Sequence, residues 1–493
     1  MLRRICATRF YKTTSNPLQS TVYALSTPFA KSAIAVVRIS GPQASYVLGK
    51  LTKSDAPPQH RVAKVRKLYS MQDSKLLDEA LTLFFKSPKS YTGLDLLELH
   101  LHGGTAIIKA VLKSIRDLHD PESGKIIRQA EPGEFSHQAF VNGKYDLTAL
   151  EGISEVINAE TEQQRLASLS SMTGQTKSLF NKWRQDILEN VANLTTLIDF
   201  GEDHDLTEID TLFHDVGSNI SNLEKQIKAY LKNVKSSQVL LNGIQLTLLG
   251  PPNAGKSSIL NTLSNKDAAI VSDIAGTTRD VLDIPLDIGG YKVVLGDTAG
   301  IRSLNKADKI EQEGIKRAKL KSLSADLILV VLDPTNNEHN EAIFDHVSEL
   351  VNKHQKDVIV VLNKEDLFLE QEANIVARYA EKLNVSIDII RVVSCSSGYG
   401  IEALRNELIA KFKAMTHFGS QDAAIVSSRV QDILEFDVLS GFKEFHHWKE
   451  EGDVVLASEG LRQSIEGIGK ITGEAIGIEE ILGVVFSNFC IGK

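Results

Sequence analysis

Eight residues from Gly250 to Ser257 read GPPNAGKS, a spacing of glycine, lysine and serine that can hold a chain of phosphates. The apolar run before them, residues 244–249, predicts a buried strand, and Ile259, Leu260 and Leu263 after them have helical spacing. Where a strand, a tight turn and a helix start follow in this order, backbone N–H groups and the helix dipole hold phosphate oxygens. The sequence therefore predicts a nucleotide-binding loop.

Two side chains of this loop are expected to act directly on the phosphates. Lys256 can reach the β and γ phosphates as a catalytic cation, and the Ser257 hydroxyl can ligate Mg²⁺. The residues predicted to bind the phosphates are Asn253, Ala254, Gly255, Lys256, Ser257 and Ser258.

A second polar segment, NKED at residues 363–366, predicts which base the nucleotide carries. It follows the apolar run 358–362, at the carboxyl end of a predicted strand, where open α/β sheets bind their ligands. A carboxylate only accepts hydrogen bonds, and guanine offers two donors on one edge, whereas adenine presents an acceptor there. Asp366 is therefore predicted to select guanine, although a solvated polar turn is the alternative. The other residues predicted around the base are Asn363, Lys364 and Ser394.

Two segments between these motifs predict a nucleotide-dependent switch. In DTAG, Asp297 is expected to hold Mg²⁺ through water, and the N–H of Gly300 to sense the γ phosphate. In GTTRD, Thr277 and Thr278 offer hydroxyls, and Thr278 is expected to complete the Mg²⁺ shell. Loops ordered by Mg²⁺ and the γ phosphate are released on hydrolysis, so the stretch from about residue 240 to 415 is interpreted as a GTPase domain.

The residue directly after DTAG is Ile301, where many small GTPases place a glutamine that orients the attacking water. An aliphatic side chain cannot orient water, so either hydrolysis is very slow or another polar residue takes this role. Glu311 is the candidate, and the alternative is a surface carboxylate near a solvated helix start.

The bulk composition limits the class of protein. With 493 residues the chain can form two to four domains, and its net charge of −8 means that any contact with nucleic acid must use local patches. Three distant cysteines, Cys6, Cys395 and Cys490, argue against a disulfide framework or a zinc site and for a reducing compartment. No apolar run approaches the roughly 20 residues of a membrane span.

The first 18 residues are basic and rich in hydroxyl groups, and no acidic residue occurs before Asp55. This composition predicts a mitochondrial transit peptide, with a disordered basic tail as the alternative. Beyond it the pattern is α+β, with strands expected at 32–39, 81–85 and 96–101 and a helix at 105–118. Helical patterns then occupy residues 145–200 and 207–236 and resume after about residue 417, which predicts one helical domain interrupted by an inserted GTPase domain.

Several segments together resemble one family. YTGLDLLELHLHGG at 91–104, EPGEFSHQAFVNGKYDLTALE at 131–151, the nucleotide motifs above and the terminal FCIGK at 489–493 are similar to the MnmE (TrmE) tRNA-modification GTPases. With its presequence, the chain resembles the eukaryotic mitochondrial member of that family. The implied fold class is multidomain α/β plus all-α. Its implied parts are a transit peptide (1–18), an α+β folate-binding and dimerisation domain (19–136), a helical domain (137–240 and 417–493) and an inserted Ras-like P-loop domain (241–416).

The resemblance also implies a function. The protein is expected to be the GTP-hydrolysing subunit of a mitochondrial complex that modifies carbon 5 of the wobble uridine in tRNA. The implied one-carbon donor is 5-formyl- or methylene-tetrahydrofolate, and the added group is of the carboxymethylaminomethyl or taurinomethyl type. The implied partners are a second copy of the chain, an FAD-dependent protein of the MnmG type and mitochondrial tRNA, in the matrix or at the inner membrane.

Site residues follow from the resemblance, position by position. The implied folate contacts are Arg38, Glu98, Lys144 and the terminal Lys493, and Cys490 is either a reactive thiol or a small buried residue. Glu311 matches the family's catalytic glutamate. The implied K⁺ ligands are Asn253, Thr277 and the backbone carbonyls of Ser272 and Ile274.

The chain departs from the family at two positions. Glu131 and Gln138 stand where the family commonly has arginine, which puts any anion contact there in doubt. His100 and His102 alternate on a predicted strand, but no third metal ligand is evident, so packing or hydrogen bonding is the favoured interpretation.

Two rival functions remain. A ribosome-assembly GTPase acting as an RNA-binding switch would share the GTPase motifs but would lack the PGEF and FCIGK segments. A folate-binding one-carbon carrier with a vestigial GTPase is disfavoured by the intact Lys256, Ser257, Asp297 and Asp366.

Overall fold

A computed structural model of the chain describes residues 20–200, 206–251, 253–263, 284–296, 322–335, 341–368, 370–416 and 427–474. The chain divides into two compact units, each of which is described by itself. The first contains residues up to Ser154, Lys177–Gln185 and the described residues from Gln463 onward. The second contains Glu155–Thr176 and the described residues of Asp186–Arg462. The expected transit peptide lies outside the described residues.

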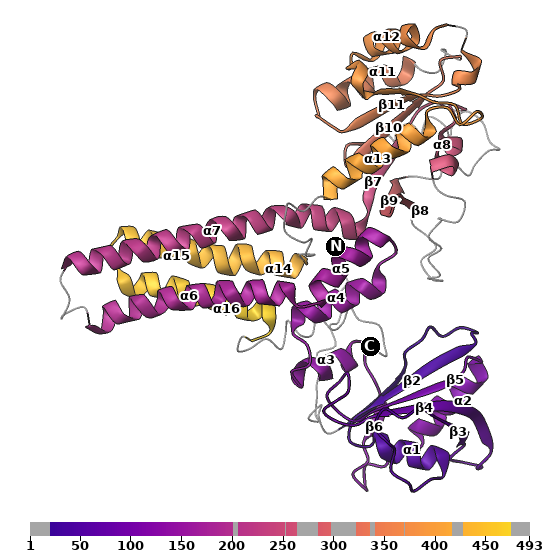
Figure 1. The fold of residues 1–493 in the computed structure, drawn as a ribbon, viewed down its shortest axis with the longest axis vertical. Coiled ribbons are helices and arrows are strands. Elements are labelled where there is room, and N and C mark those ends of the chain that lie inside the picture. The colour runs from indigo at the N-terminus through magenta and orange to yellow at the C-terminus, as the bar shows by residue number, and fades with distance from the viewer. Residues whose placement is uncertain are drawn as a thin grey trace, which may run out of the picture. The chain divides into compact units, whose positions relative to one another are not determined.

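The first unit is built on a six-stranded sheet (Figure 1). The strand order is β3-β4-β5-β2-β1-β6, and only β1 and β6 are parallel. Its strands are β1 (Thr21–Leu25), β2 (Ile34–Ser40), β3 (Lys64–Tyr69), β4 (Leu76–Phe85), β5 (Leu96–His102) and β6 (Ile127–Gln129). The predicted strands at 32–39, 81–85 and 96–101 are confirmed as β2, β4 and β5.

The two faces of this sheet have different environments because side chains alternate along each strand. Helices α1 (Ala44–Thr52) and α2 (Thr105–Arg116) supply apolar side chains to one face, where Val37, Leu99 and Ile115 are fully buried. The predicted helix at 105–118 is confirmed as α2. Helix α3 (Glu134–Val141) packs at one end of the opposite face, and the described residues leave most of the rest of that face partly or fully exposed, so we call it the open face.

Helix α4 (Leu147–Asn158) begins directly after Asp146, whose side chain caps it. Asp146 Oδ1 accepts hydrogen bonds from the N–H groups of Thr148 and Ala149 at 3.0 and 3.1 Å. An acidic cap satisfies N–H groups that have no partner inside the helix and matches the positive end of its dipole. The segment NGKYDLTALE therefore changes from a loop to a helix at Leu147.

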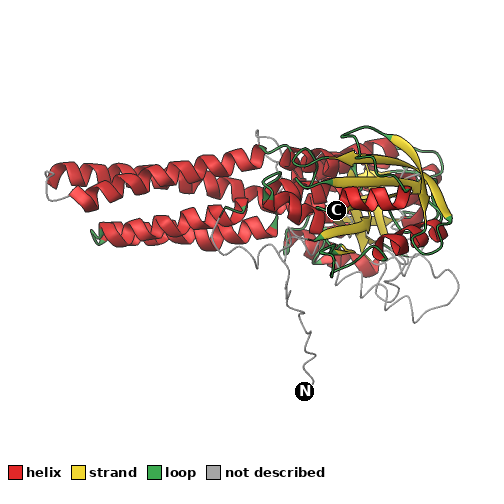
Figure 2. Ribbon diagram, turned by 90° about the horizontal axis from the view of Figure 1, so that it is seen from below, coloured by secondary structure: helices red, strands yellow, loops and turns green. Residues whose placement is uncertain are grey.

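The second unit contains long helices that run side by side (Figures 1 and 2). Phe213 and Phe445, from helices before and after the nucleotide motifs, meet edge to face at 6.2 Å. Gln238 and Gln431 join the same two parts of the chain by a side-chain hydrogen bond of 3.2 Å. The helices with residues in this unit are α5 (Glu162–Met172), α6 (Gln175–Phe200), α7 (Leu206–Asn242), α14 (Ser428–Ile433), α15 (Leu439–Glu450) and α16 (Val454–Thr472), with a π-helical turn at Leu434–Val438; α6 and α16 belong to it only in part. Among the described residues, no helix is long and apolar enough to cross a membrane.

The nucleotide motifs lie on a second six-stranded sheet, ordered β12-β11-β10-β7-β9-β8. All pairs are parallel except the β8–β9 hairpin, so five strands end at one edge with their carboxyl ends together. The strands are β7 (Ile244–Leu249), β8 (Ile284–Ile288), β9 (Tyr291–Gly296), β10 (Leu327–Leu332), β11 (Val358–Leu362) and β12 (Ile390–Val392). The covering helices are α8 (Lys256–Leu263), α11 (Glu341–Asn352), α12 (Glu372–Leu383) and α13 (Ile401–Thr416).

One residue separates α7 from β7. Gly243 adopts a left-handed conformation with φ of 92°, which ends the helix and turns the chain into the strand. The side chain of Gln164, in α5, covers this junction. Its Nε2 donates to the carbonyl oxygens of Leu240 and Leu241 at 3.1 and 2.9 Å. The helix that leads into the nucleotide sheet is therefore fixed at its end by a helix far upstream in the sequence.

The β8–β9 hairpin contacts the same part of the helical region. Lys292 of β9 forms an ion pair with Glu160 at 2.5 Å, and the N–H of Gln163 donates to the carbonyl of Gly290 in the hairpin turn at 3.2 Å. Gln164 Oε1 completes the contact by accepting from the N–H groups of Glu160 and Thr161. The start of α5 is thus bonded both to the end of α7 and to the hairpin.

Candidate functional site

The phosphate loop predicted at 250–257 lies between β7 and α8, as the sequence indicates. Gly250 has φ of 153°, and a Cβ there would stand 2.1 Å from the carbonyl oxygen of Val331 in β10. Gly255 has φ of 96°, and a Cβ there would stand 2.0 Å from Asn363 Nδ2. Both glycines are therefore required by close approach as well as by backbone conformation. The turn between them passes through Asn253, which also has a positive φ of 59°.

The loop presents its polar groups at the start of α8. Lys256 Nζ donates to the carbonyl oxygens of Gly250 and Pro251 at 2.8 and 2.7 Å, so the lysine curls over its own loop. Ser257 and Ser258 are exposed in the first turn of the helix, whereas Ala254 is fully buried. An exposed hydroxyl beside unbonded helix N–H groups fits a phosphate with its Mg²⁺.

Asn363 connects the predicted base-binding segment to the phosphate loop. Its side chain is 2 % exposed, and Nδ2 donates to the carbonyl oxygen of Ala254 at 2.9 Å. Its Oδ1 is buried and has no hydrogen-bond partner within the described part of the protein. Lys364, in a left-handed conformation, forms an ion pair with Asp333 at 2.5 Å. Asp333 follows directly after β10, so residues from two strand ends fix the NKED segment.

Asp366 is exposed, and serine hydroxyls orient its carboxylate. Ser394 Oγ donates to Asp366 Oδ1 at 2.5 Å, and hydrogen bonds from Ser394 and then Ser396 hold the pKa of Asp366 below its usual range. The N–H of Glu365 donates to the carbonyl of Val393 at 3.1 Å, which joins the two segments through their backbones. Asp366 is thus kept ionised as an acceptor, as guanine recognition requires. Burial raises the pKa of the neighbouring Cys395 thiol, which favours its neutral form.

Several predicted residues of the nucleotide site lie outside the described residues. They are Ser272, Ile274, Thr277, Thr278, Asp297, Gly300 and Glu311. The residues that the structure does bring together at one sheet edge are Asn253, Ala254, Gly255, Lys256, Ser257, Ser258, Asn363, Lys364, Asp366 and Ser394. Of the expected metal ligands, Ser257 and Asn253 are described and exposed, so both side chains are available to an ion.

A second polar site lies on the open face of the first sheet. Arg38 in β2 and Glu98 in β5 are directly opposite each other, and Arg38 Nε donates to Glu98 Oε1 at 2.9 Å. His100 Nε2 lies 3.4 Å from the other carboxylate oxygen of Glu98. The arrangement places one partly exposed cation and one nearly buried anion on neighbouring strands.

Aromatic rings lie close to this ion pair. The rings of Tyr91 and Tyr145 are 5.5 Å apart, and Tyr91 Oη is hydrogen-bonded to Ser136 Oγ at 2.9 Å. Burial is the main cause that raises the pKa of Tyr91, and the charge of Arg38 is near enough to oppose it. Lys144 is exposed beside Tyr145 on the loop after α3. Flat rings beside a cation, an anion and a mobile ammonium group are suited to a planar heterocycle that carries carboxylates.

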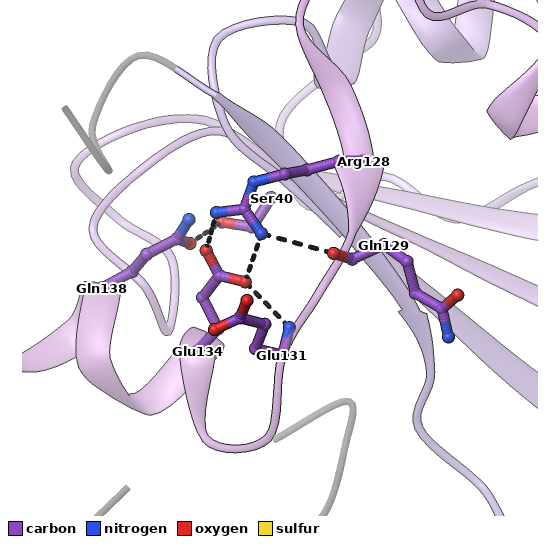
Figure 3. A network of polar contacts seen from close by, with 6 residues as sticks. All are labelled: Ser40, Arg128, Gln129, Glu131, Glu134 and Gln138. Carbon is purple, nitrogen blue, oxygen red and sulfur yellow. Dashed lines mark hydrogen bonds and ion pairs between the residues drawn. The ribbon is translucent and has the colours of Figure 1, made fainter. Parts of the chain in front are cut away.

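The PGEF segment is held by a polar network (Figure 3). Glu134 forms a two-pronged ion pair with Arg128 and accepts from the N–H of Glu131 at 2.9 Å. Gln138 is 1 % exposed, and its Oε1 accepts from Ser40 Oγ at 2.7 Å. Position 138 therefore holds a buried, neutral amide that fixes α3 against the sheet.

The remaining predictions concern metals and the C-terminus. His102 Nδ1 is bonded to Asp78 at 2.7 Å, and the described residues contain no cluster of three or more side chains that could hold a metal ion. The interpretation of His102 as a hydrogen-bonding residue is confirmed. Cys490 and Lys493 lie outside the described residues.

The sequence reasoning missed Asp333, Tyr91 and Gln164. Asp333 could have been found from the sequence, because it follows a strongly apolar strand. The polar segments DTAG and NKED were recognised at the same kind of position. Tyr91 is the first residue of the segment 91–104, but its spacing from the other polar residues does not mark it as a site residue. Gln164 gives no signal for its contact with α7, because two of its bonds are local, to Glu160 and Thr161, and the other two reach Leu240 and Leu241, which lie far away in the sequence.

Comparisons with known proteins cover nearly the whole chain. A family model described as "MnmE helical domain" matches residues 147–490, and one described as "GTP-binding protein TrmE N-terminus" matches residues 21–144. A mitochondrial tRNA modification GTPase of Saccharomyces cerevisiae, MSS1, is 48% identical over 96% of this chain and 93% of its own length. The mitochondrial 5-taurinomethyluridine-[tRNA] synthase subunit GTPB3 of Danio rerio is 37% identical over 97% and 94%. The tRNA modification GTPase MnmE of Rickettsia prowazekii is 36% identical over 96% and 100%.

Proposed function

The chain belongs to the MnmE (TrmE) family of tRNA modification GTPases, and we propose that its GTP hydrolysis drives modification of carbon 5 of the wobble uridine. Like its mitochondrial relatives, it is a GTPase that acts in tRNA modification in the mitochondrion. The added group is proposed to be of the carboxymethylaminomethyl or the taurinomethyl type, according to the amino acid that serves as the second substrate.

The observation that carries the GTPase assignment is the bond between Asn363 and Ala254. It joins a segment suited to guanine to a loop suited to phosphates, although the two are 109 residues apart. The nucleotide would be held by backbone N–H groups of the loop, by Lys256 on the phosphates and by Asp366 on the base. Mg²⁺, held by Ser257 and Thr278, would neutralise charge that develops on the phosphates.

Hydrolysis needs a residue that orients water, and Ile301 cannot do so. We assign this role to Glu311, which follows Gly300 of DTAG by eleven positions in the sequence. K⁺, with Asn253, Thr277 and the carbonyls of Ser272 and Ile274 as ligands, would supply positive charge in the place of an arginine finger. The exposed side chain of Asn253 fits this role, since a buried amide would be unavailable to an ion from solvent.

The first unit is proposed to bind the tetrahydrofolate derivative. Glu98 can accept hydrogen bonds from a pterin edge, Tyr91 and Tyr145 can stack on flat rings, and Arg38, Lys144 and Lys493 can meet glutamate carboxylates. The bound folate supplies the one-carbon unit, and Cys490 is placed in the same C-terminal motif as Lys493. Gln138 is buried and neutral, so it is not expected to contact those carboxylates.

Assembly is proposed to use the open face of the same sheet. Ile34, Val65 and Leu81 point to that face and are 60, 64 and 38% exposed, a set of apolar side chains that a second copy of the chain would cover. The flavin-dependent MnmG-type protein is the proposed further partner. We also infer that the segment 241–416 is inserted into the helical domain, because helices on either side of it pack together.

Mass spectrometry of wobble nucleosides in mitochondrial tRNA tests this function. After deletion of the gene, an unmodified uridine is expected at the wobble position. In a parallel assay the purified chain should hydrolyse GTP and leave ATP intact, because adenine offers an acceptor to Asp366. A normal wobble nucleoside combined with failed ribosome assembly would overturn the proposal in favour of a ribosome-assembly GTPase.

A further inference from the structure

The outer edge of the first sheet carries a row of exposed cations. Strand β3 forms this edge (Figure 1), pairs only with β4 among the described strands and contains Lys64, Arg66 and Lys67. Arg61 precedes the strand, and Lys86 and Lys89 follow β4 on the adjoining loop. We call these six residues, Arg61, Lys64, Arg66, Lys67, Lys86 and Lys89, the basic edge; all are exposed except the half-buried Arg66.

The two loops of the basic edge are bonded to each other, so its cations form one group. The N–H of Arg61 donates to the carbonyl of Phe84 at 2.8 Å, and the N–H of Lys86 donates to His60 Nδ1 at 3.0 Å. The Arg61 guanidinium reaches the carbonyl of Lys89 at 3.4 Å. From Lys64 to Lys67 the strand adds about 10 Å at roughly 3.3 Å per residue.

Within the described part of the chain, no carboxylate neutralises these cations. None of the six forms an ion pair with a described residue, whereas Arg38, Arg128 and Lys75 elsewhere in the unit each have a carboxylate partner. In the ladder Glu79 lies opposite Lys67 and Asp78 opposite Leu68, and the carboxylate of Asp78 is bonded to His102 instead. Unpaired like charges repel one another, so this arrangement costs stability unless an external anion binds.

The charge of the basic edge contrasts with that of the rest of the chain. Residues 20–146 contain 17 Lys and Arg against 12 Asp and Glu, a formal charge of +5, while residues 147–493 sum to −17. A polyanion approaching this protein is therefore repelled by most of the chain and attracted to one part of it.

Protection of a sheet edge against aggregation is one use for lysine on β3. That use requires charges on the strand itself, and three of the six cations lie on the flanking loops. A uniform row of unpaired Lys and Arg, spread over a strand and two loops, instead matches a backbone of phosphates. We propose that the basic edge binds the phosphate backbone of the RNA substrate. This inference rests on the proposed function, since it takes the RNA to be the tRNA that the protein helps to modify.

The test compares two variants of the full-length protein with equal changes of charge. Lys64→Gln with Lys89→Gln removes two cations of the basic edge that are separate from the open sheet face. Lys225→Gln with Lys232→Gln removes two exposed lysines of α7 as the control. Binding of a transcribed mitochondrial tRNA is measured between about 50 and 200 mM salt, with GTP hydrolysis measured on the same samples.

The basic-edge variant should bind tRNA ~10- to 60-fold more weakly at about 0.1 M salt, and its salt slope should fall by ~1.5 to 1.8. The control should bind like wild type, and both variants should hydrolyse GTP normally. Equal weakening of the control, unchanged binding of the basic-edge variant or no tRNA binding by wild type would overturn the proposal. The proposal would also be overturned if the basic-edge variant binds tRNA normally but no longer binds phosphatidylcholine–cardiolipin vesicles, because the basic edge would then be a membrane-binding surface. Absence of GTP hydrolysis in every sample would refute the proposed function instead.

Discussion

Asn363 offers the sharpest test of how the base segment supports the phosphate loop. From outside the phosphate loop, Asn363 Nδ2 donates a hydrogen bond to the buried carbonyl oxygen of Ala254 at 2.9 Å. In Asn363→Ala this carbonyl loses its partner, which costs about 1–3 kcal/mol. If the whole loss appears in binding, GTP affinity falls by about 5- to 150-fold.

Asn363→Asp has nearly the same shape and should be worse. It replaces the Nδ2 donor by a carboxylate oxygen that faces the Ala254 oxygen in a buried site, where an uncompensated charge costs about 3–5 kcal/mol. Burial and the facing oxygen should raise the pKa of the introduced carboxyl. The protonated acid can donate to Ala254, so the affinity of the Asp variant should recover as the pH falls, while that of the Ala variant should not.

Equilibrium titration with a fluorescent guanine nucleotide, between about pH 5.5 and 8, measures these affinities. Asn374→Asp, at an exposed position on α12, is the matched control and should bind like wild type. The reasoning is refuted if Asn363→Ala binds as tightly as wild type, or if the Asp and Ala variants have the same affinity and the same pH dependence.

Four other predictions concern separate parts of the protein. Asp366→Asn should weaken GTP binding by about 10²- to 10⁴-fold, because the acceptor loses its charge and one of its two oxygens becomes an NH₂ donor that faces the guanine amino group. The variant should favour xanthosine triphosphate, whose base offers an acceptor there; competition binding measures both. Glu311→Ala should bind GTP normally but hydrolyse it about 10²- to 10⁴-fold more slowly. Wild-type hydrolysis should be much faster in K⁺ than in Na⁺, and equal phosphate release in the two salts would refute the role of Asn253 as a K⁺ ligand. Gln164→Leu should destabilise the second unit by about 2–6 kcal/mol, since four hydrogen bonds to buried backbone groups are lost, and faster hydrogen exchange at Glu160 and Thr161 would report it. Burial holds the pKa of His137 below its usual value of about 6.5, so as the pH falls the unfolded chain takes up a proton before the folded chain does. The free energy of unfolding should therefore fall as the pH drops below about 6.5, and a His137→Gln variant whose free energy of unfolding depends on pH as steeply as that of wild type would contradict this.

The nucleotide motifs could be read from the sequence because their chemistry is local. In GPPNAGKS, the glycines, the lysine and the serine act within one turn between a strand and a helix, so their spacing alone defines the phosphate loop. The cap of α4 by Asp146 is equally local, although it was not predicted from the sequence. Apolar alternation likewise predicted β2, β4 and β5, because one face of each strand is buried.

Gln138 and Gln164 show why other parts could not be predicted. Both are ordinary amides in helical sequence, and their functions come from partners that only folding brings near. Gln138 meets Ser40 across 98 residues, and Gln164 meets the end of α7 across 76. The register of β2 against β5 sets Arg38 opposite Glu98. This register also depends on distant residues, because it is fixed by the packing of one whole face of the sheet.

The sequence by itself therefore determined that this chain binds a guanine nucleotide, since short-range steric and electrostatic requirements leave few residues able to form such a loop. The tertiary structure decided how the loop is supported. It placed the Asn363 donor on the Ala254 carbonyl, bonded the start of α5 to both α7 and the β8–β9 hairpin, and gathered unpaired cations along β3. These arrangements depend on hydrogen bonds and charges between distant segments, whose strength appears only when burial and register bring the groups within a few ångströms.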